Sequence, residues 1–156
     1  MIWLPVLCTD DRLRGLYQRH YSSEKATRRR GHPVAPNQLR VAGPGEVKAY
    51  LTVDGRAGWI WRFAKFRKDG QQGVECVLFR NEASVGCHNS SHEHCSSKMV
   101  AEADELAWVK WPGQRLFTFV DPGKILSSNP GYCFKRAGWR FCGVSKSGLH
   151  ILEVSP

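Results

Sequence analysis

The sequence predicts a mixed α/β fold in which helices cover both faces of a central, mostly antiparallel sheet. Apolar and aromatic segments separated by turn signals are typical of consecutive strands, and they lie at residues 47–53, 57–66 and 74–79. A helical pattern follows before the next strand, which favours a strand–helix–strand crossover. The 156 residues, of which 42% are hydrophobic, suit one domain, with a basic N-terminal segment over 1–45 and a core over 46–156.

The start of the chain is expected to hold one strand and one helix. Residues 1–8 are apolar but shorter than a signal peptide or a membrane span, so we expect a strand. Thr9 is expected to cap a helix over about residues 10–20, because two aspartates follow it in the first turn. A loop rich in Arg, Gly and Pro comes next.

The C-terminal part is expected to alternate between helices and strands. Ser97 is expected to cap the clearest helix of the chain, whose apolar stripe begins at Met99. Glu102, Asp104 and Glu105 are expected on its opposite, polar side. The remaining predicted elements are a strand at 115–120, a short helix opened by Asn129 and Pro130, and two strands at 140–144 and 149–154.

The charge of the chain favours a polyanionic partner, and no membrane partner is expected because no apolar run is long enough to cross a bilayer. The formal net charge is +9 and the isoelectric point is about 9.5, and much of the excess lies in the N-terminal segment. We expect nucleic-acid phosphates to bind the basic side chains Arg19, Lys25, Arg28, Arg29 and Arg30. The alternative is an ordinary solvated surface.

The cysteines favour a reduced, cytoplasmic protein. Six of them are spread along the chain and no secretory signal precedes them, so we expect free thiols, with a disulfide scaffold as the alternative. Enough ligands for a zinc or iron ion lie in the polar loop over residues 83–96, namely Cys87, His88, His92, His94 and Cys95. Their spacing fits no common zinc motif, so a metal site and a plain polar loop both stay open.

Two junctions between strands and helices are candidates for a functional site. The strand at 74–79 leads through a loop to Ser96 and Ser97, where free helix N–H groups and serine hydroxyls favour an anion. Asp121 follows the next strand, at a strand end of the kind where open α/β sheets place functional groups. Tyr132 lies in the first turn of the short helix that follows. The alternative is structural, with Asp121 forming a turn and Tyr132 packing.

A resemblance to a known family rests on six segments, in order along the chain: HYS at 20–22, PGE at 44–46, DGQQGVECVLFRNE at 69–82, SSKMVAEADELAW at 96–108, RLFTFVDP at 115–122 and NPGYCFKRAGW at 129–139. On these segments the chain resembles the phage Mom DNA-modification proteins, within the GNAT N-acyltransferase superfamily. The resemblance implies a GNAT-like fold. It also implies a transferase that adds a carbamoylmethyl or acyl-type group to the exocyclic amine of adenine in double-stranded DNA, so that a phage or prophage genome evades restriction.

The same resemblance implies which residues form the site. The residues expected near the chemistry are Asp121, Tyr132, His20 and Tyr21. The expected cofactor contacts are Arg80, Ser96, Ser97 and Asn129. A carboxylate or phenolate beside the amine would accept its proton as the new bond forms. The target base has to leave the duplex stack, and the aromatic residues expected to stack on it are Tyr21, Trp59 or Trp61.

The donor and the reaction class stay open at this level. The glycine-spaced pyrophosphate loop typical of GNAT enzymes is absent from residues 83–96, which counts against acetyl-CoA. The donor therefore stays open between acetyl-CoA and another acyl or aminoacyl compound. One alternative is an acetyl-CoA-dependent N-acetyltransferase that acts on a protein or a small amine. Another is a non-catalytic GNAT-fold module that binds DNA. The oligomeric state is equally open, with a homodimer as one expectation.

Overall fold

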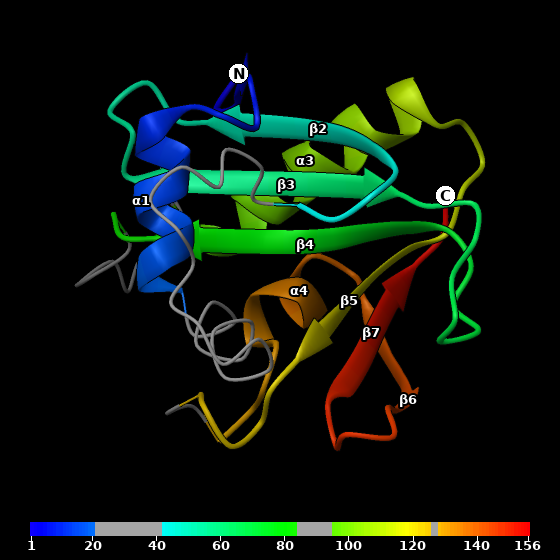
Figure 1. Cartoon of the computed structure of the whole chain (residues 1–156). Coiled ribbons are helices and arrows are strands. Elements are labelled where there is room, and N and C mark those ends of the chain that lie inside the picture. Colours follow the sequence, from blue (N-terminus) through cyan, green and yellow to red (C-terminus); the bar gives the residue numbers. More distant parts are fainter. Residues whose placement is uncertain (21–41, 84–94, 126–127) are drawn as a thin grey trace, which may run out of the picture.

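A computed structural model describes residues 1–20, 42–83, 95–125 and 128–156 of the chain (Figure 1). The elements follow in the order β1 (Leu4–Val6), α1 (Asp11–Arg19), β2 (Glu46–Leu51), β3 (Ala57–Phe63), β4 (Val74–Asn81), α3 (Ser96–Lys110), β5 (Leu116–Val120), α4 (Tyr132–Arg136), β6 (Arg140–Val144) and β7 (His150–Val154). The predicted mixed α/β class is confirmed, and the strand ends differ from their predicted positions by a few residues. No helix within those ranges is long and apolar enough to cross a bilayer.

The strands form one seven-stranded sheet in the order β1-β2-β3-β4-β5-β7-β6. Neighbouring strands are antiparallel except β4 and β5, which run parallel. The chain passes from β4 to β5 through α3, as a parallel connection requires. The predicted mixed, mostly antiparallel sheet is therefore confirmed, and its two edges are β1 and β6.

The helix starts differ from the predicted caps. Asp10, and not Thr9, caps α1, because its carboxylate accepts a hydrogen bond of 2.9 Å from the backbone N–H of Arg12. Cys95 precedes α3, so Ser97 lies inside that helix. The residue before α4 is Gly131, which has a φ of 74° that favours glycine. A Cβ at Gly131 would also lie 2.3 Å from Leu152, so no other residue fits there without movement.

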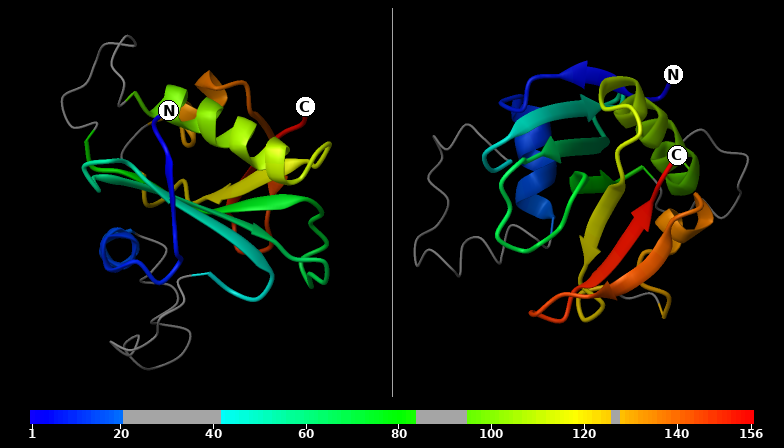
Figure 2. Two further views of the ribbon diagram at one scale, coloured as in Figure 1. Left: turned by 90° about the horizontal axis from the view of Figure 1, so that it is seen from above. Right: turned by 90° about the vertical axis from the view of Figure 1, so that its right-hand side faces the viewer.

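Side chains of the central strands divide into two apolar clusters, because successive residues of a strand point to opposite faces. Trp59 of β3 belongs to a cluster with residues of α3 and α4. Ile60 belongs to a second cluster, with Leu13 and Leu16 of α1. Figure 2 shows α1 and α3 to opposite sides of β2, β3 and β4. Gly58 permits the close approach of α1, since a Cβ there would lie 2.9 Å from each of the two leucines.

Helix α3 is fixed to the rest of the molecule by indole N–H groups. Trp3 donates to the carbonyl of Met99 at 2.8 Å, and Trp61 donates to the carbonyl of Ala103 at 3.1 Å. Trp139 donates to a carboxylate oxygen of Asp104 at 2.8 Å. Buried indoles need such partners, and each bond fixes α3 along and about its own axis.

Asp104 is buried, contrary to its predicted place on the polar side of α3. Its side chain is 3% exposed, and one carboxylate oxygen has no hydrogen-bond partner among the described residues. Burial raises the pKa of Asp104 to about 7, and the hydrogen bond from Trp139 opposes this effect. The helical period predicts the apolar face of α3 correctly. Asp104 nevertheless lies in the interior because the indole N–H of Trp139 donates a hydrogen bond to its carboxylate.

The burial of Asp104 predicts a dependence of stability on pH. The folded protein keeps the proton up to about pH 7, whereas the unfolded chain releases it near pH 4, so stability falls as the pH rises between these values. Asp104→Asn removes this loss. Urea unfolding should show the variant gaining about 2–3 kcal/mol over the wild type on going from pH 5 to pH 8. An equal difference between the two proteins at both pH values would contradict the assignment.

Candidate functional site

Strands β4 and β5 diverge, and this divergence forms the framework of the candidate site. They pair over only three residues each, from Val74 with Leu116 to Cys76 with Thr118. Beyond these pairs β4 continues to Asn81 beside β3, while β5 continues beside β7. Figure 1 shows the two strands spreading apart towards their carboxyl ends. The ends of β4 and β5 are therefore separate places, both facing the same end of the sheet.

A β-bulge lies on β4 where the divergence begins. Ile60 of β3 is opposite Leu78, but Trp61 is opposite Cys76, so Val77 is the extra residue on β4. Cys76 is also the last residue of β4 that pairs with β5. A bulge changes the direction of backbone and side-chain groups, and this one lies where the pairing of β4 with β5 ends.

The end of β4 contacts the start of α3. The amide nitrogen of Asn81 donates to the hydroxyl of Ser96 at 3.1 Å, which joins these two segments across the intervening loop. The hydroxyl of Ser97 lies 3.3 Å from the sulfur of Cys95. That hydrogen bond is the main cause that lowers the pKa of the Cys95 thiol. Of the two predicted anion contacts, Ser96 thus bonds to the end of β4 and Ser97 follows it in α3, with Asn81 as an additional residue of the site.

Arg80 belongs to an ionic cluster at the same end of β4. The carboxylate of Glu82 accepts from Arg80 at 2.8 Å and from Arg19 at 2.6 and 3.1 Å. Arg56 donates to the backbone carbonyl of Glu82 at 3.1 Å. The hydrogen bonds from Arg19 and then Arg80 lower the pKa of Glu82 to about 2. Sequence reasoning missed Arg56 and Glu82, although Glu82 lies only two residues beyond Arg80.

His20 lies at the end of α1, close to this cluster. Its backbone N–H bonds to the carbonyl of Tyr17 at 2.9 Å. Burial, and then the charge of Arg80, lowers the pKa of His20 to about 4. The imidazole is therefore neutral at pH 7. The structure thus brings together three residues with different predicted roles. His20 is predicted to act in catalysis, Arg19 to bind DNA phosphates and Arg80 to bind the cofactor.

Asp121, Asn129 and Tyr132 follow β5, on the other strand end. A carboxylate oxygen of Asp121 accepts from the backbone N–H of Gly123 at 3.0 Å, so this residue shapes a turn. Asn129 accepts from the ammonium group of Lys135 at 2.7 Å, and its carbonyl accepts from the N–H of Tyr132 at 3.1 Å. The side chain of Tyr132 is 54% exposed at the start of α4. Tyr132 does not pack in the core, so its hydroxyl is accessible.

Trp59 and Trp61 do not fit the predicted role of stacking on a target base. Both side chains are completely buried, and each contacts other aromatic rings of the core. Their strand is central in the sheet, and α3 covers the face on which they lie. We correct that expectation, which leaves Tyr21 as the aromatic candidate, and Tyr21 lies outside the described residues.

Other predicted positions also lie outside the described ranges. These are the basic residues Lys25, Arg28, Arg29 and Arg30, and the loop residues Cys87, His88, His92 and His94. The described part of the chain contains no group of three or more His, Cys, Asp or Glu side chains placed to hold a metal ion. The described cysteines, namely Cys8, Cys76, Cys95, Cys133 and Cys142, are free thiols.

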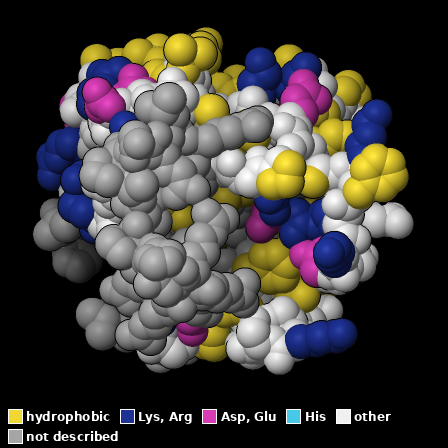
Figure 3. All heavy atoms as spheres, in the orientation of Figure 1, with side chains coloured by type: hydrophobic (Ala, Val, Ile, Leu, Met, Phe, Trp, Pro, Cys, Tyr) yellow, Lys and Arg dark blue, Asp and Glu magenta, His cyan; other side chains and the backbone are white. Residues whose placement is uncertain are grey.

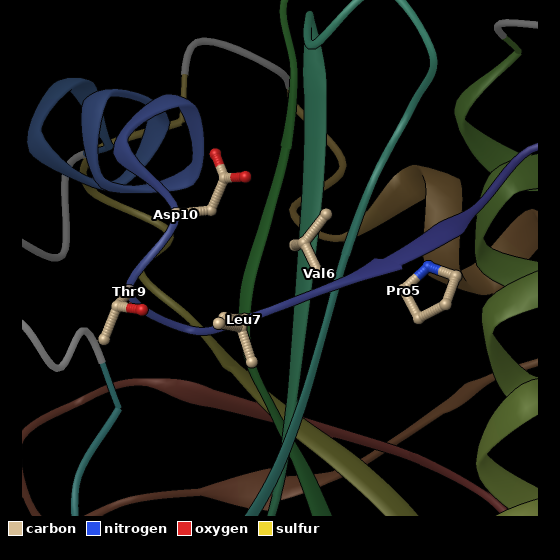
Figure 4. Close-up of a pocket in the computed structure, with 5 residues that line it drawn as sticks. All are labelled: Pro5, Val6, Leu7, Thr9 and Asp10. Atoms are coloured by element: carbon tan, nitrogen blue, oxygen red, sulfur yellow. The ribbon is translucent and has the colours of Figure 1, made fainter.

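Basic side chains lie at several separate places on the described part of the visible face (Figure 3). Figure 3 shows Lys and Arg side chains spread over this face, several of them beside acidic ones. A surface hollow is lined by Pro5, Val6, Leu7, Thr9 and Asp10 (Figure 4). None of these residues belongs to the predicted site, so the hollow adds nothing to it.

Models of known protein families give no match to this chain, and neither do curated protein sequences.

The surroundings of His20 predict its titration. We expect the imidazole to titrate with a pKa of about 4, and Arg80→Gln to raise that pKa by removing the nearby positive charge. Nitrogen-detected NMR of the ring between about pH 3 and 8 measures both values. Arg140→Gln, on the distant edge strand β6, is the matched control and should leave His20 unchanged. A wild-type midpoint near the ordinary value of about 6.5 would contradict the burial of this ring.

Proposed function

We propose that the chain is a GNAT-like transferase that adds a carbamoylmethyl or acyl-type group to the exocyclic amine of adenine in double-stranded DNA. One observation carries the proposal: β4 leaves β5 after Cys76 and carries a bulge at Val77 at that point. Beyond the bulge, backbone groups of β4 have no β5 partner. A diverging pair of strands with a helix starting nearby is an arrangement suited to an extended acyl donor.

The donor is held at the end of β4. Backbone N–H groups of a bulged strand and of a helix start bind carbonyl and phosphate oxygens, and they stabilise charge that develops on an acyl oxygen. Ser96 and Ser97 supply hydroxyl groups at the start of α3. The donor is acetyl-CoA or another acyl or aminoacyl compound, and these groups suit the carbonyl and phosphate oxygens that such donors share.

Asp121 and Tyr132 handle the proton. An exocyclic amine is a weak nucleophile, so its proton has to be accepted as its nitrogen bonds to the carbon of the transferred group and the leaving group departs with the bonding electrons. Asp121 supplies a carboxylate at the end of β5, and Tyr132 supplies an exposed hydroxyl at the start of α4. His20 is neutral at pH 7 and is a further acceptor.

The charge of the chain supports DNA as the substrate. The net charge of +9 favours phosphate contacts, and affinity for DNA should fall steeply with salt. The target adenine is flipped out of the duplex to reach the site. In this proposal the protein acts in the cytoplasm of a bacterial host, on phage or prophage DNA.

A non-catalytic DNA-binding module is the second candidate. One observation favours it: the carboxylate of Asp121 is already bonded to the N–H of Gly123, as in an ordinary turn. In that case the charge of Asp121 has no function beyond the turn.

The two candidates predict different results for Asp121→Asn, which keeps the turn acceptor but cannot take a proton. Nucleosides from plasmid DNA of expressing cells should contain a new adenosine species with the wild type, and at least about a hundredfold less with the variant. Asp69→Asn is the matched control, because Asp69 accepts from the N–H of Gln71 in a similar turn and lies outside the proposed site. A modification that survives in Asp121→Asn would remove this residue from the chemistry. Abundant folded protein with unmodified DNA would favour the non-catalytic module.

A further inference from the structure

Three arginines from separate parts of the chain meet at Glu82. Arg19 is the last residue of α1, Arg56 directly precedes β3, and Arg80 lies near the end of β4. Arg19 contacts the carboxylate through two nitrogens and Arg80 contacts it through one, while Arg56 contacts the carbonyl of the same residue. Residues far apart in sequence thus direct guanidinium groups to one place.

The cluster has a surplus of positive charge and is open to solvent. Three guanidinium groups and one carboxylate give a formal charge of +2. The side chains of Arg19, Arg80 and Glu82 are 54%, 31% and 27% exposed. An ion therefore reaches the cluster from solution without opening the core.

Two other ionic clusters of the sheet show the contrast. Arg62 and Arg67 face Glu75, and Arg67 also faces Asp69, so two positive charges balance two negative ones. Arg115 and Arg140 face Glu153, which leaves a charge of only +1. Arg67 and Arg115 also lie over the ring of Phe117, at 5.0 and 4.8 Å from its centre. The first of these clusters is neutral and the second has a smaller surplus than the Glu82 cluster, which has the largest excess of positive charge among the three.

We propose that Arg19, Arg56 and Arg80 form a binding site for a backbone phosphate of DNA, and that Glu82 is the internal anion that occupies it in the free protein. A guanidinium group binds carboxylate and phosphate with the same fork of N–H donors, so one anion can replace the other. The inference rests on the proposed function only in taking DNA as the partner. It adds three named residues that contact a phosphate, and a carboxylate, that of Glu82, which competes with that phosphate for them.

The exposure of the cluster favours a polymer phosphate over that of a small cofactor. Partly exposed side chains on a surface suit one phosphate of a long ligand that is held at many points. The net charge of +9 provides further basic side chains for those other points.

The inference is tested by fluorescence anisotropy with a labelled duplex of about 20 base pairs, between about 50 and 300 mM salt. Arg56→Gln should weaken binding and reduce the slope of log affinity against log salt by about 0.9, since one phosphate contact is lost. Glu82→Gln should tighten binding by about three- to tenfold, because a like charge beside the phosphate is removed.

Matched controls separate a local site from a general effect of charge. Arg140→Gln and Glu153→Gln make the same charge changes in the Glu153 cluster, and each should change affinity much less than its counterpart. Arg56→Lys keeps the positive charge but loses the paired N–H donors of the guanidinium group. Compared with Arg56→Gln, it should restore the salt slope but only part of the affinity. Thermal unfolding of each variant checks that the fold is kept, and Arg56→Lys serves as the test where Glu82→Gln unfolds.

The outcomes distinguish this inference from the proposed function. If the wild type binds and modifies DNA but Glu82→Gln behaves like Glu153→Gln, the inference fails and the proposed function stands. If coenzyme A displaces the duplex from the wild type but not from Arg56→Gln, the arginines bind a cofactor phosphate and the inference also fails. If the wild type binds no DNA at all, both fail.

Discussion

Helix α3 is held on the sheet by hydrogen bonds from buried indoles, and the geometry of the site depends on this attachment. Trp3, Trp61 and Trp139 come from the N-terminus, a central strand and the C-terminal part, and each donates to α3. Apolar packing alone would let a helix slide or rotate by small amounts, whereas three directional bonds fix it. The start of α3 is thereby set beside the end of β4, where Asn81 meets Ser96.

The sheet is predictable because strands and turns depend on residues close together in the sequence. The side-chain contacts that sequence reasoning missed join residues far apart in the sequence. Alternating apolar residues and turn glycines predict strands, and the crossover follows from a helix between two of them. Asp104 was misplaced because its donor, Trp139, is 35 residues away. The Glu82 cluster could not be predicted because Arg19 and Glu82 are 63 residues apart. The resemblance supplied Arg80, Ser96 and Ser97 as candidates, but pairwise geometry needs the folded chain.

Several acidic side chains of the described structure form ion pairs or hydrogen bonds with side chains of the same protein. Glu75 and Glu153 each join two arginines, and Glu46 joins Lys110 and Trp111. Such pairs orient side chains more than they add stability, since exposed ion pairs contribute little.

Residues 21–41 contain five Lys and Arg and a single Glu, so they carry a charge of +4 out of the total of +9. Nearly half of the surplus thus lies in one segment directly after α1.

The parallel pairing of β4 with β5 also constrains the order in which the chain folds. Strands β2, β3 and β4 are consecutive and antiparallel, so their contacts are local and form quickly. Cys76 and Thr118 meet across 42 residues, and closing that loop costs entropy that only the docked helix repays. Before α3 and β5 dock, the edge of β4 beside β5 has no partner strand, and an unpaired strand edge is open to pairing with another chain. Docking of α3 and β5 therefore covers this edge and also completes the candidate site.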